Sequence, residues 1–317
     1  MSAQISLLFR CMFHIFESLN LNKLSKNRVR LPFKQKQDRS NISNSMANNL
    51  LKGKRGIITG ALDPNSIAWK VAEKVFEEGG QFVLTNAPLA MRMGKINELA
   101  AACNTEVIPA DATSVEDLTN LFTRSQEVLG GKIDFMLHSI GMSPNIRKSK
   151  PYEDLNYEWY LKTLDISALS FHKMMAVADK LDALNHGGSI VALSYIASQR
   201  VFPDYTDMAQ AKAVLESIAR SFGQVLGIKK GIRVNTISQS PTMTTAGQGI
   251  DGFDAFFTYA DKMSPLGNAP AEACADYCIA MFSDLTRHVT MQNLFHDGGF
   301  SSVGISQPIV EALTPKA

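Results

Sequence analysis

Tyr205 and Lys212 are the two side chains whose types and spacing most directly indicate chemistry. They stand seven positions apart in a stretch with helical patterning, residues 205–226, so two helical turns place both side chains on one face. The ammonium of Lys212 can stabilise negative charge that develops beside it, and the phenol of Tyr205 can donate a hydrogen bond to an oxyanion. An amphipathic helix also produces this spacing by chance, so the pair alone leaves a catalytic site and an ordinary helix face both open.

The loop that follows the first predicted strand is a second candidate for binding chemistry. Gly60 comes directly after the apolar run at 55–59, and Ser66 stands at the N-cap position of the next predicted helix. Free backbone N–H groups and the dipole at a helix N-terminus favour a pyrophosphate there. The loop lacks the further glycines of G-x-G-x-x-G, so an ordinary strand-to-helix turn remains the alternative.

Polar residues and a glycine also follow the next three predicted strands. Asn86 ends the second strand, where no acid is present to bind a ribose 2′-hydroxyl, and Arg92 beyond it can meet a 2′-phosphate or face solvent. Asp111, after the third strand, can accept from an adenine amino group or cap the following helix. Gly141, after the fourth, allows a ligand to approach the backbone closely. Taken together, the four strand ends predict a dinucleotide site.

Short apolar segments alternate with helical patterns from residue 52 onward. The segments that read as strands are residues 55–59, 81–86, 106–110, 133–139, 189–194, 232–238 and 293–296. The helical patterns include residues 66–78, 114–129, 156–184, 205–226 and 271–282. Near-continuous apolar strands that alternate with helices are typical of a parallel sheet covered on both faces. We therefore predict one doubly wound α/β domain over residues 46–317, in which ligands bind beyond the carboxyl ends of the strands.

The composition excludes several classes of protein. With 317 residues, 45% of them hydrophobic and 20% charged, the chain is neither disordered nor collagen-like nor a disulfide-stapled mini-domain. The formal charge of +2 is unevenly distributed, because residues 1–45 carry eight basic and two acidic residues and the remainder carries 24 basic and 28 acidic residues. The domain is therefore mildly acidic behind a basic leader, and nothing in this balance indicates nucleic acid as a partner.

The basic leader has two explanations. Residues 7–16 are apolar but are interrupted by Arg10, and no small-residue cleavage site follows, which argues against a secretory signal. A segment that contains Arg and Ser and is poor in acids is compatible with an organellar transit peptide. We favour an upstream extension, because Met46 opens the run directly before the first strand, and we expect residues 1–45 to be disordered or absent from the mature protein.

Neither the cysteines nor the histidines form a metal-binding pattern. Cys274 and Cys278 are four apart on a predicted helix and share one face, which fits two buried apolar residues better than a metal pair. His138 fits a structural role better than that of a metal ligand. No apolar run approaches the roughly 18–20 residues of a membrane span, so we expect a cytoplasmic protein without a membrane partner.

One set of motifs spans nearly the whole predicted domain. It comprises Gly60-x5-Ser66-Ile67-Ala68, His138-Ser139-Ile140-Gly141, Leu193-Ser194-Tyr195, Tyr205-x6-Lys212, Arg233-Val234-Asn235 and Asp297-Gly298-Gly299. On these motifs, residues 52–300 resemble the bacterial NADH-dependent enoyl-acyl-carrier-protein reductases, a divergent branch of the short-chain dehydrogenase/reductase superfamily. The Tyr-x6-Lys spacing is discriminating, since ordinary members of the superfamily use Tyr-x3-Lys and the fourth residue after Tyr205 is Ala209.

The resemblance implies a Rossmann-type fold with a parallel sheet of about seven strands. It also implies NADH as cofactor and trans-2-enoyl thioesters on acyl carrier protein as substrates, in the last reductive step of each cycle of fatty-acid elongation, and a homotetramer. NADPH stays open as a cofactor, because Asn86 is neutral and Arg92 follows it. Two other functions also stay open: a short-chain dehydrogenase that acts on ketones or alcohols, and a catalytically silent nucleotide-binding regulator.

The same resemblance implies roles for individual residues. Tyr205 donates a hydrogen bond to the thioester carbonyl, Lys212 holds the nicotinamide ribose, and Tyr195 matches a second family tyrosine. Ser143 lies on the substrate side of the site, with Tyr195 and Tyr205. The residues implied to bind the cofactor are Gly60, Ser66, Ile67, Asn86, Asp111, Ala112, Ile140, Lys212, Thr242, Met243, Thr244, Thr245 and Ala246.

Residues 240–267, after the sixth predicted strand, are rich in methionine and aromatic side chains. We predict that they form a mobile helical flap over the acyl chain, with an ordinary packed helical insertion as the alternative. In well-known members of the family this flap presents basic residues to the acidic carrier protein. Here the matching stretch is Asp251-Gly252-Phe253-Asp254-Ala255, so we expect the carrier to dock elsewhere.

Overall fold

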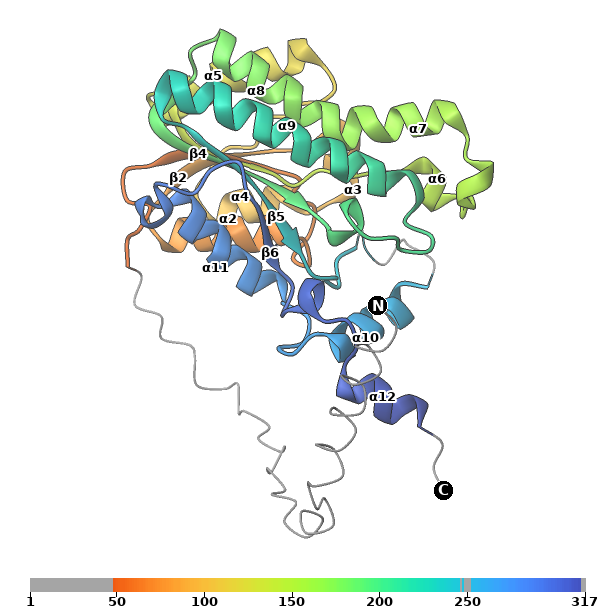
Figure 1. Cartoon of the computed structure of the whole chain (residues 1–317). Helices are drawn as coiled ribbons and strands as arrows, with labels where there is room; N and C mark the ends of the chain where they lie inside the picture. The colour runs from red at the N-terminus through yellow and green to blue at the C-terminus, as the bar shows by residue number, and fades with distance from the viewer. Residues whose placement is uncertain (1–47, 246, 248–251, 315–317) are drawn as a thin grey trace, which may run out of the picture. The chain divides into compact units, whose positions relative to one another are not determined.

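A parallel sheet of six strands lies at the centre of the computed structural model, which describes residues 48–245, 247 and 252–314 (Figure 1). The strands are β1 (Arg55–Thr59), β2 (Gln81–Thr85), β3 (Ile133–His138), β4 (Leu184–Ser194), β5 (Arg233–Gln239) and β6 (Asn293–His296). Their order is β2-β1-β3-β4-β5-β6, and every neighbouring pair is parallel. The doubly wound α/β prediction is thereby confirmed. The predicted leader, residues 1–45, lies outside the described residues.

The predicted strand at 106–110 does not form a full strand. It lies beside β2, where the backbone N–H of Ile108 donates to Leu84 O at 2.9 Å, but only the bridge between Leu84 and Val107 is formed. Pro109 has no N–H to donate, and the segment lies at the edge of the sheet with a partner on one side only. The described sheet therefore has six strands in place of the predicted seven or so.

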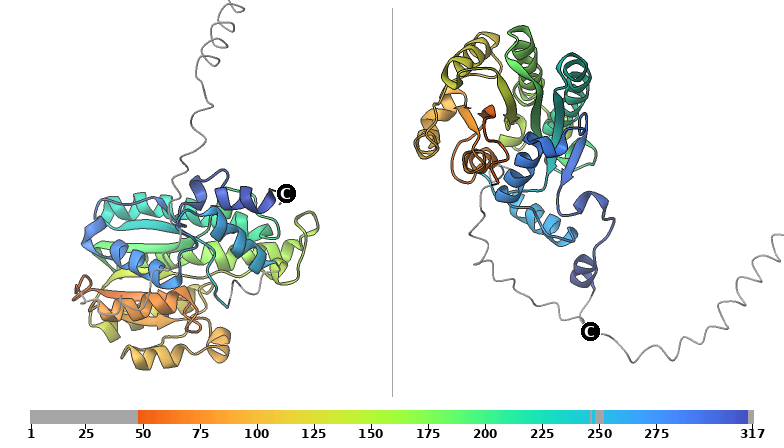
Figure 2. Two further views of the ribbon diagram at one scale, coloured as in Figure 1. Left: turned by 90° about the horizontal axis from the view of Figure 1, so that it is seen from below. Right: turned by 90° about the vertical axis from the view of Figure 1, so that its left-hand side faces the viewer.

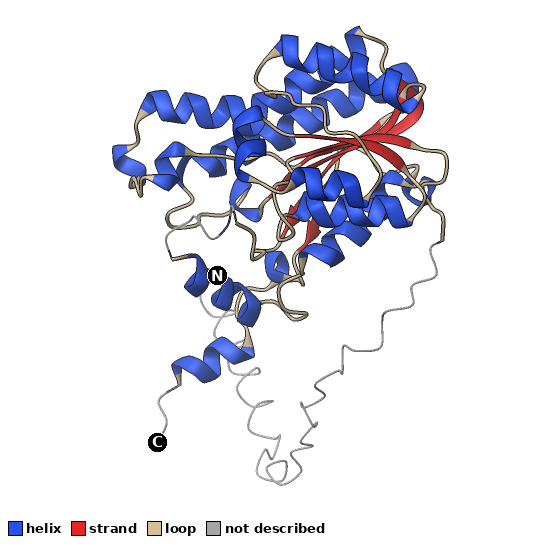
Figure 3. Cartoon of the chain, turned by 180° about the vertical axis from the view of Figure 1, so that it is seen from behind, coloured by secondary structure: helices blue, strands red, loops and turns tan. Residues whose placement is uncertain are grey.

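Helices cover both faces of the sheet (Figure 2; Figure 3). They are α2 (Ile67–Glu77), α3 (Pro88–Met93), α4 (Ile96–Ala102), α5 (Val115–Leu129), α6 (Pro144–Arg147), α7 (Tyr157–Leu164), α8 (Ser170–Lys180), α9 (Thr206–Lys230), α10 (Phe253–Met263), α11 (Ala271–Phe282) and α12 (Gln307–Leu313). One apolar core joins the sheet to α2, α4 and α11 and contains the free thiols of Cys274 and Cys278. A second core joins the opposite face to α5, α8 and α9. Burial on both faces explains why the strands are apolar along nearly their whole length.

The single helix predicted over 156–184 is wrong in detail. A π-helical turn, Asp165–Leu169, separates α7 from α8, and α8 ends at Lys180 before β4 begins. Ser167 in this turn accepts a hydrogen bond from the N–H of Met142 at 3.0 Å and donates to Met142 O at 3.1 Å. A π-helical turn contains one residue more than an α-helical turn, and here the turn contacts the loop after β3. The local sequence pattern does not reveal this contact.

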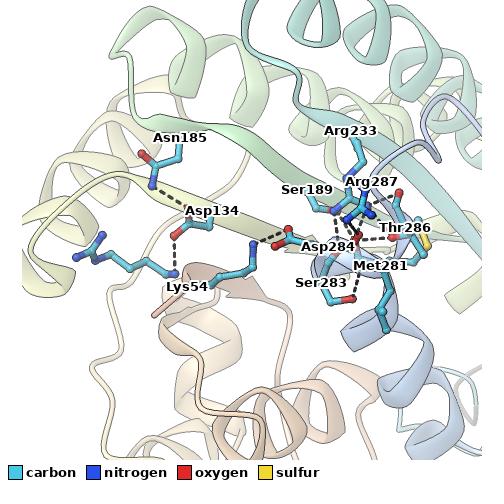
Figure 4. Close-up of polar contacts among 12 residues, drawn as sticks. Lys54, Asp134, Asn185, Ser189, Arg233, Met281, Ser283, Asp284, Thr286 and Arg287 are labelled. Atoms are coloured by element: carbon cyan, nitrogen blue, oxygen red, sulfur yellow. Dashed lines mark hydrogen bonds and ion pairs between the residues drawn. The ribbon is translucent and has the colours of Figure 1, made fainter. Parts of the chain in front are cut away.

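The Arg233 side chain anchors the start of β5 to the end of α11, on the side of the sheet away from the strands' carboxyl ends (Figure 4). It is buried, and its guanidinium donates to Met281 O at 2.8 Å, to Thr286 O at 3.0 Å and to Ser283 O at 3.0 Å. Burial lowers the pKa of Arg233, and Asp284 opposes that shift. Arg233 belongs to a motif that carries the family resemblance, and its role here is structural.

We expect Arg233→Met to lower the free energy of unfolding by about 3 kcal/mol, because buried carbonyls lose their donor. Chemical denaturation measures this loss. The matched control is Lys54→Met, which removes a partly exposed ion pair with Asp284 (2.9 Å; Figure 4) and should cost less than about 1 kcal/mol. Equal losses in the two variants would contradict the role assigned to Arg233.

Candidate active site

A cavity of about 640 Å³ opens at the carboxyl ends of β3, β4 and β5. Its walls come from the loops after these three strands, from the first turns of α9 and from α10. Ile67 at the start of α2 also lines it. The cavity thus lies where ligands bind in open α/β sheets.

Lys212 projects from α9 into this cavity and is buried there. Its ammonium donates to Leu193 O at 2.7 Å, at the end of β4. Burial lowers the pKa of Lys212 to about 8, while the nearby carboxylate of Glu216 acts in the opposite direction. A Cβ on Gly141 would stand 3.8 Å from Nζ, so a side chain there would begin to fill the space beside the ammonium.

Two tyrosines lie together on the wall of the same cavity. The ring centroids of Tyr195 and Tyr205 are 5.1 Å apart. Burial raises the pKa of both phenols, and Tyr205 adds to the rise at Tyr195, so both remain proton donors at neutral pH. Tyr195 Oη is buried and has no hydrogen-bond partner among the described residues. The structure therefore brings the predicted Tyr195, Tyr205 and Lys212 together.

Aromatic side chains close the cavity beside these tyrosines. Phe256 of α10 meets Phe202 edge-on, with centroids 5.2 Å apart and an interplanar angle of 90°. It also meets Tyr195 edge-on at 6.2 Å. The cavity therefore combines an apolar wall with two phenols and one ammonium, a set of groups that can stabilise negative charge on a substrate oxygen.

Gly60 and Ser66 shape the loop after β1 without lining the cavity. Gly60 has φ +86°, and a Cβ there would lie 1.9 Å from Ser139 O, so only glycine fits. Ser66 stands at the N-cap position, but its hydroxyl accepts from Leu62 N at 3.2 Å and Asp63 N at 3.1 Å instead of capping α2. The predicted N-cap position of Ser66 is thus confirmed, but its side chain does not cap the helix, and the first turn of α2 has no side-chain cap.

The residues predicted to bind the cofactor divide into two groups. Those that line the cavity are Ile67, Ile140, Lys212, Thr242, Thr244 and Thr245. Those that do not are Gly60, Ser66, Asn86, Asp111, Ala112 and Met243, while Ala246 lies outside the described residues. Within the second group, Asn86 donates to Ala61 O at 3.0 Å and so ties β2 to the loop after β1.

Asp111 forms a turn and does not cap α5. Its carboxylate accepts from Thr113 N at 2.9 Å, whereas the hydroxyl of Ser114 caps the helix by accepting from Asp117 N at 3.1 Å. Of the two roles left open for Asp111, helix capping is therefore excluded. Arg92 is exposed on α3.

His138 is buried behind the cavity, in contact with Ser170 at 2.8 Å. Since Ser170 donates its own proton to Ile166 O, its oxygen accepts from Nε2 of the imidazole. Burial and the charge of Lys212 lower the pKa of His138 to about 3, so the ring is neutral. Among residues 48–245, 247 and 252–314, no group of His, Cys, Asp and Glu side chains is placed to hold a metal ion.

Asp207, in the first turn of α9, is a buried carboxylate that sequence reasoning missed. It accepts from Ser143 Oγ at 2.6 Å, Asn145 Nδ2 at 2.8 Å and Thr163 Oγ1 at 2.8 Å. Ser143 immediately precedes α6, Asn145 lies within α6 and Thr163 lies on α7. The carboxylate therefore connects α9 to α6 and α7 beside the cavity. The hydroxyl of Ser143, predicted on the substrate side, is committed to this contact.

We expect Asp207→Ala to lower the free energy of unfolding by about 2 kcal/mol, because Ser143 would lose its acceptor, while Asn145 and Thr163 would keep only Asn156 O and Trp159 O. Asp207→Asn keeps one acceptor oxygen and should lose less. Thermal or denaturant unfolding of both variants checks the order. A loss at Asp207→Ala no greater than that of an average surface change, about 0.5 kcal/mol, would refute it.

The comparison with known proteins decides the family. Residues 60–301 match the model of a family described as Enoyl-(Acyl carrier protein) reductase. The chain belongs to this family. The enoyl-acyl-carrier-protein reductase family was the one that the motifs indicated, so that prediction is confirmed.

Relatives and solved structures of the reductase family match over most of their length. Enoyl-[acyl-carrier-protein] reductase [NADH] 1 of Rhizobium meliloti (strain 1021) is 33% identical over 271 residues, which cover 82% of this chain and 95% of that protein. The crystal structure of the FabI–NADH complex from Alistipes finegoldii is 61% identical, with a TM-score of 0.83 over 85% of this chain and 95% of that one. The reductase from Aquifex aeolicus VF5 is 31% identical, with a TM-score of 0.74 over 81% and 99%. Within the described part of this reductase, no helix has the length and apolar character required to cross a bilayer.

Proposed function

We propose that this protein is an NADH-dependent enoyl-acyl-carrier-protein reductase, which converts trans-2-enoyl thioesters to acyl thioesters in fatty-acid elongation. The observation that carries the proposal is the convergence of Tyr195, Tyr205 and Lys212 on one cavity with an apolar wall, in a chain of this family. Relatives at about one third identity bear the name of this enzyme with NADH, and the Alistipes finegoldii structure contains NADH.

The cavity residues fit a dinucleotide cofactor. The first turn of α2 has no side-chain cap, and although Trp69 N donates to Ser66 O, the N–H groups of Ile67 and Ala68 are available to a phosphate. Gly141 leaves open space beside Lys212, whose ammonium can donate to ribose hydroxyls. Ile140 and Thr242 also line the cavity and belong to the proposed binding surface.

Bound NADH would supply a hydride to the β-carbon of the enoyl thioester. Negative charge then develops on the thioester carbonyl oxygen. Tyr205, held as a protonated phenol by its burial, would donate a hydrogen bond to that oxygen. This interaction is stronger in the transition state than in the ground state and therefore raises the rate. Tyr195 stands 5.1 Å away, ring to ring, and would support the position of Tyr205.

The decisive assay follows the oxidation of NADH and of NADPH with trans-2-enoyl thioesters of several chain lengths. We expect NADH to be consumed with these substrates. Consumption of neither cofactor would sink the proposal, while turnover of ketones or alcohols in place of enoyl thioesters would identify a different short-chain dehydrogenase. Binding of NADH without any turnover would identify a nucleotide-binding regulator.

The natural form of the substrate is, in this proposal, a thioester on acyl carrier protein, an acidic partner. Arg147 lines the cavity and Lys148 follows it, and neither forms an ion pair with a described residue. These two cations at the rim would attract an acidic carrier. The flap itself would not, because it carries the acidic Asp254. We expect kcat/KM to be higher for carrier-linked than for carrier-free thioesters, and the difference to shrink as salt is added. On the family resemblance, we also propose that the protein is cytoplasmic and forms a homotetramer.

A further inference from the structure

Glu216 is a buried carboxylate close to the catalytic groups. The proposed mechanism gives it no role. Only 5% of its surface is exposed, and it lies on α9 one helical turn after Lys212. A buried carboxylate requires compensating hydrogen bonds. These come from Ser194 Oγ and Ser198 Oγ, both of which donate to Glu216 Oε1 at 2.6 Å.

The two serines flank the turn that carries Tyr195. Ser194 is the last residue of β4, and Ser198 ends the 3-10 turn Ile196–Ser198. The N–H of Ser198 donates to Tyr195 O at 3.0 Å and closes the turn. Glu216 therefore holds both ends of the segment from which the Tyr195 ring projects into the cavity.

Glu216 and Lys212 meet at the end of β4, because Lys212 Nζ donates to Leu193 O at 2.7 Å and the next residue, Ser194, donates to Glu216. The carboxylate therefore lies near the ammonium and favours its protonated form. The surroundings otherwise disfavour an ammonium, because Lys212 is buried and His138 on β3 is neutral. The phenols of Tyr195 and Tyr205 stay protonated. The remaining titratable side chains that line the cavity are Arg147 and Asp204.

We propose that Glu216 is a positioning residue with two linked effects: it fixes the Tyr195 turn through Ser194 and Ser198, and its charge keeps Lys212 in the ammonium form that binds NADH. The second effect rests on the proposed function, in which Lys212 holds the nicotinamide ribose. Glu216 would thus connect the cofactor side of the site with its substrate side through one carboxylate.

The test is the dissociation constant of NADH as a function of pH, measured on the full chain by the fluorescence of bound NADH. In the wild-type protein, affinity should fall as the pH rises through about 8, where Lys212 loses its proton. Glu216→Gln keeps an acceptor oxygen for the serines but removes the charge. The pKa of Lys212 then falls further, and the decline should begin about one pH unit lower. We expect NADH to bind about fivefold more weakly than to wild type near pH 8, and within about twofold near pH 6.5.

Ser198→Ala is the matched control, because it removes one hydrogen bond and leaves the Glu216 side chain in place. Its binding curve should follow that of the wild type, while its kcat should fall by a similar factor at every pH. If Glu216→Gln does not fold, Glu216→Asp takes its place. The shorter side chain would move the carboxylate away from Lys212, so the pH dependence of NADH binding should shift in the same direction by a smaller amount.

Superimposable curves for the wild type and the Glu216 variant would overturn the proposal. An equal displacement by Ser198→Ala would also overturn it, since the effect would then be structural. Failure of the proposed function is a separate result, seen as wild-type protein that binds NADH but oxidises none with any enoyl thioester. A wild-type protein that binds no NADH would overturn both.

Discussion

Replacing Lys212 by methionine should lower kcat/KM by about 10²–10³-fold and, at the same time, stabilise the fold. Methionine retains most of the apolar stem but removes the only ammonium that lines the described cavity. The loss of activity follows from the loss of the group that we propose to bind the ribose and to stabilise nearby negative charge. The gain in stability follows from the cost of burying a charge.

The size of that gain can be obtained from the pKa. The pKa of Lys212 is about 8 in the folded protein against an ordinary value of 10.5, so folding disfavours the protonated form by about 3 kcal/mol. Because the folded-state pKa is the lower one, the cost is fully present below pH 8 and disappears as the pH rises towards 10.5. The lost hydrogen bond to Leu193 O offsets part of this gain. Lys212→Met should therefore exceed the wild type in stability by about 1–2 kcal/mol at neutral pH, and the difference should narrow on the alkaline side.

Denaturant unfolding at several pH values, together with steady-state kinetics, checks both parts. Lys229→Met is the control, because Lys229 is half-exposed near the far end of the same helix and pairs with Asp179 at 2.6 Å. It should leave activity unchanged and alter stability by less than about 1 kcal/mol. A Lys212→Met variant with normal turnover and normal affinity for NADH would show that the catalytic assignment is wrong.

Tyr205→Phe should reduce kcat by about 10²–10³-fold while leaving the affinity for NADH nearly unchanged. The substitution removes one hydroxyl and keeps the ring that packs on Tyr195 at 5.1 Å, so stability should change little. Loss in kcat with little change in cofactor binding is the signature of an interaction that forms only in the transition state. Kinetics at saturating NADH and an NADH titration separate the two quantities.

Tyr195→Phe provides the matched comparison. It removes a buried hydroxyl that has no hydrogen-bond partner in the described part of the chain, so the fold should not be weakened. Its activity should fall less than that of Tyr205→Phe. The reverse order would place the essential donor at Tyr195.

Much of the fold was predictable because its determinants are local. Five of the six strands follow short apolar runs bounded by turn residues, and β4 alone begins well before its predicted start. The failures depend on contacts that are remote in sequence. The π-helical turn at Asp165–Leu169 is tied to Met142, and the edge position of residues 106–110 is a property of the whole sheet.

The candidate site was predictable only in part, for a related reason. The spacing of Tyr205 and Lys212 predicted that both lie on one helix face. In the structure Tyr205 is the N-cap residue immediately before α9, and both side chains still line one cavity. Asp207 and Glu216 were missed because an isolated acid on a helix normally faces solvent. Their hydroxyl and amide donors are contributed by other segments, so burial could not be inferred. The one available signal was that Lys212 and Glu216 are four residues apart on an otherwise apolar helix face.

The edge-on contacts of Phe256 bear on the length of acyl chain that the proposed reductase would accept. Phe256 belongs to α10, and its ring occupies the wall next to Tyr195 and Phe202. An acyl chain long enough to reach this wall would have to separate Phe256 from Tyr195 and Phe202, whereas a shorter chain would leave these contacts intact. Chain-length selectivity would then depend on the free energy of separating two aromatic pairs, each worth about 0.5–1.5 kcal/mol, rather than on the bore of a rigid tunnel.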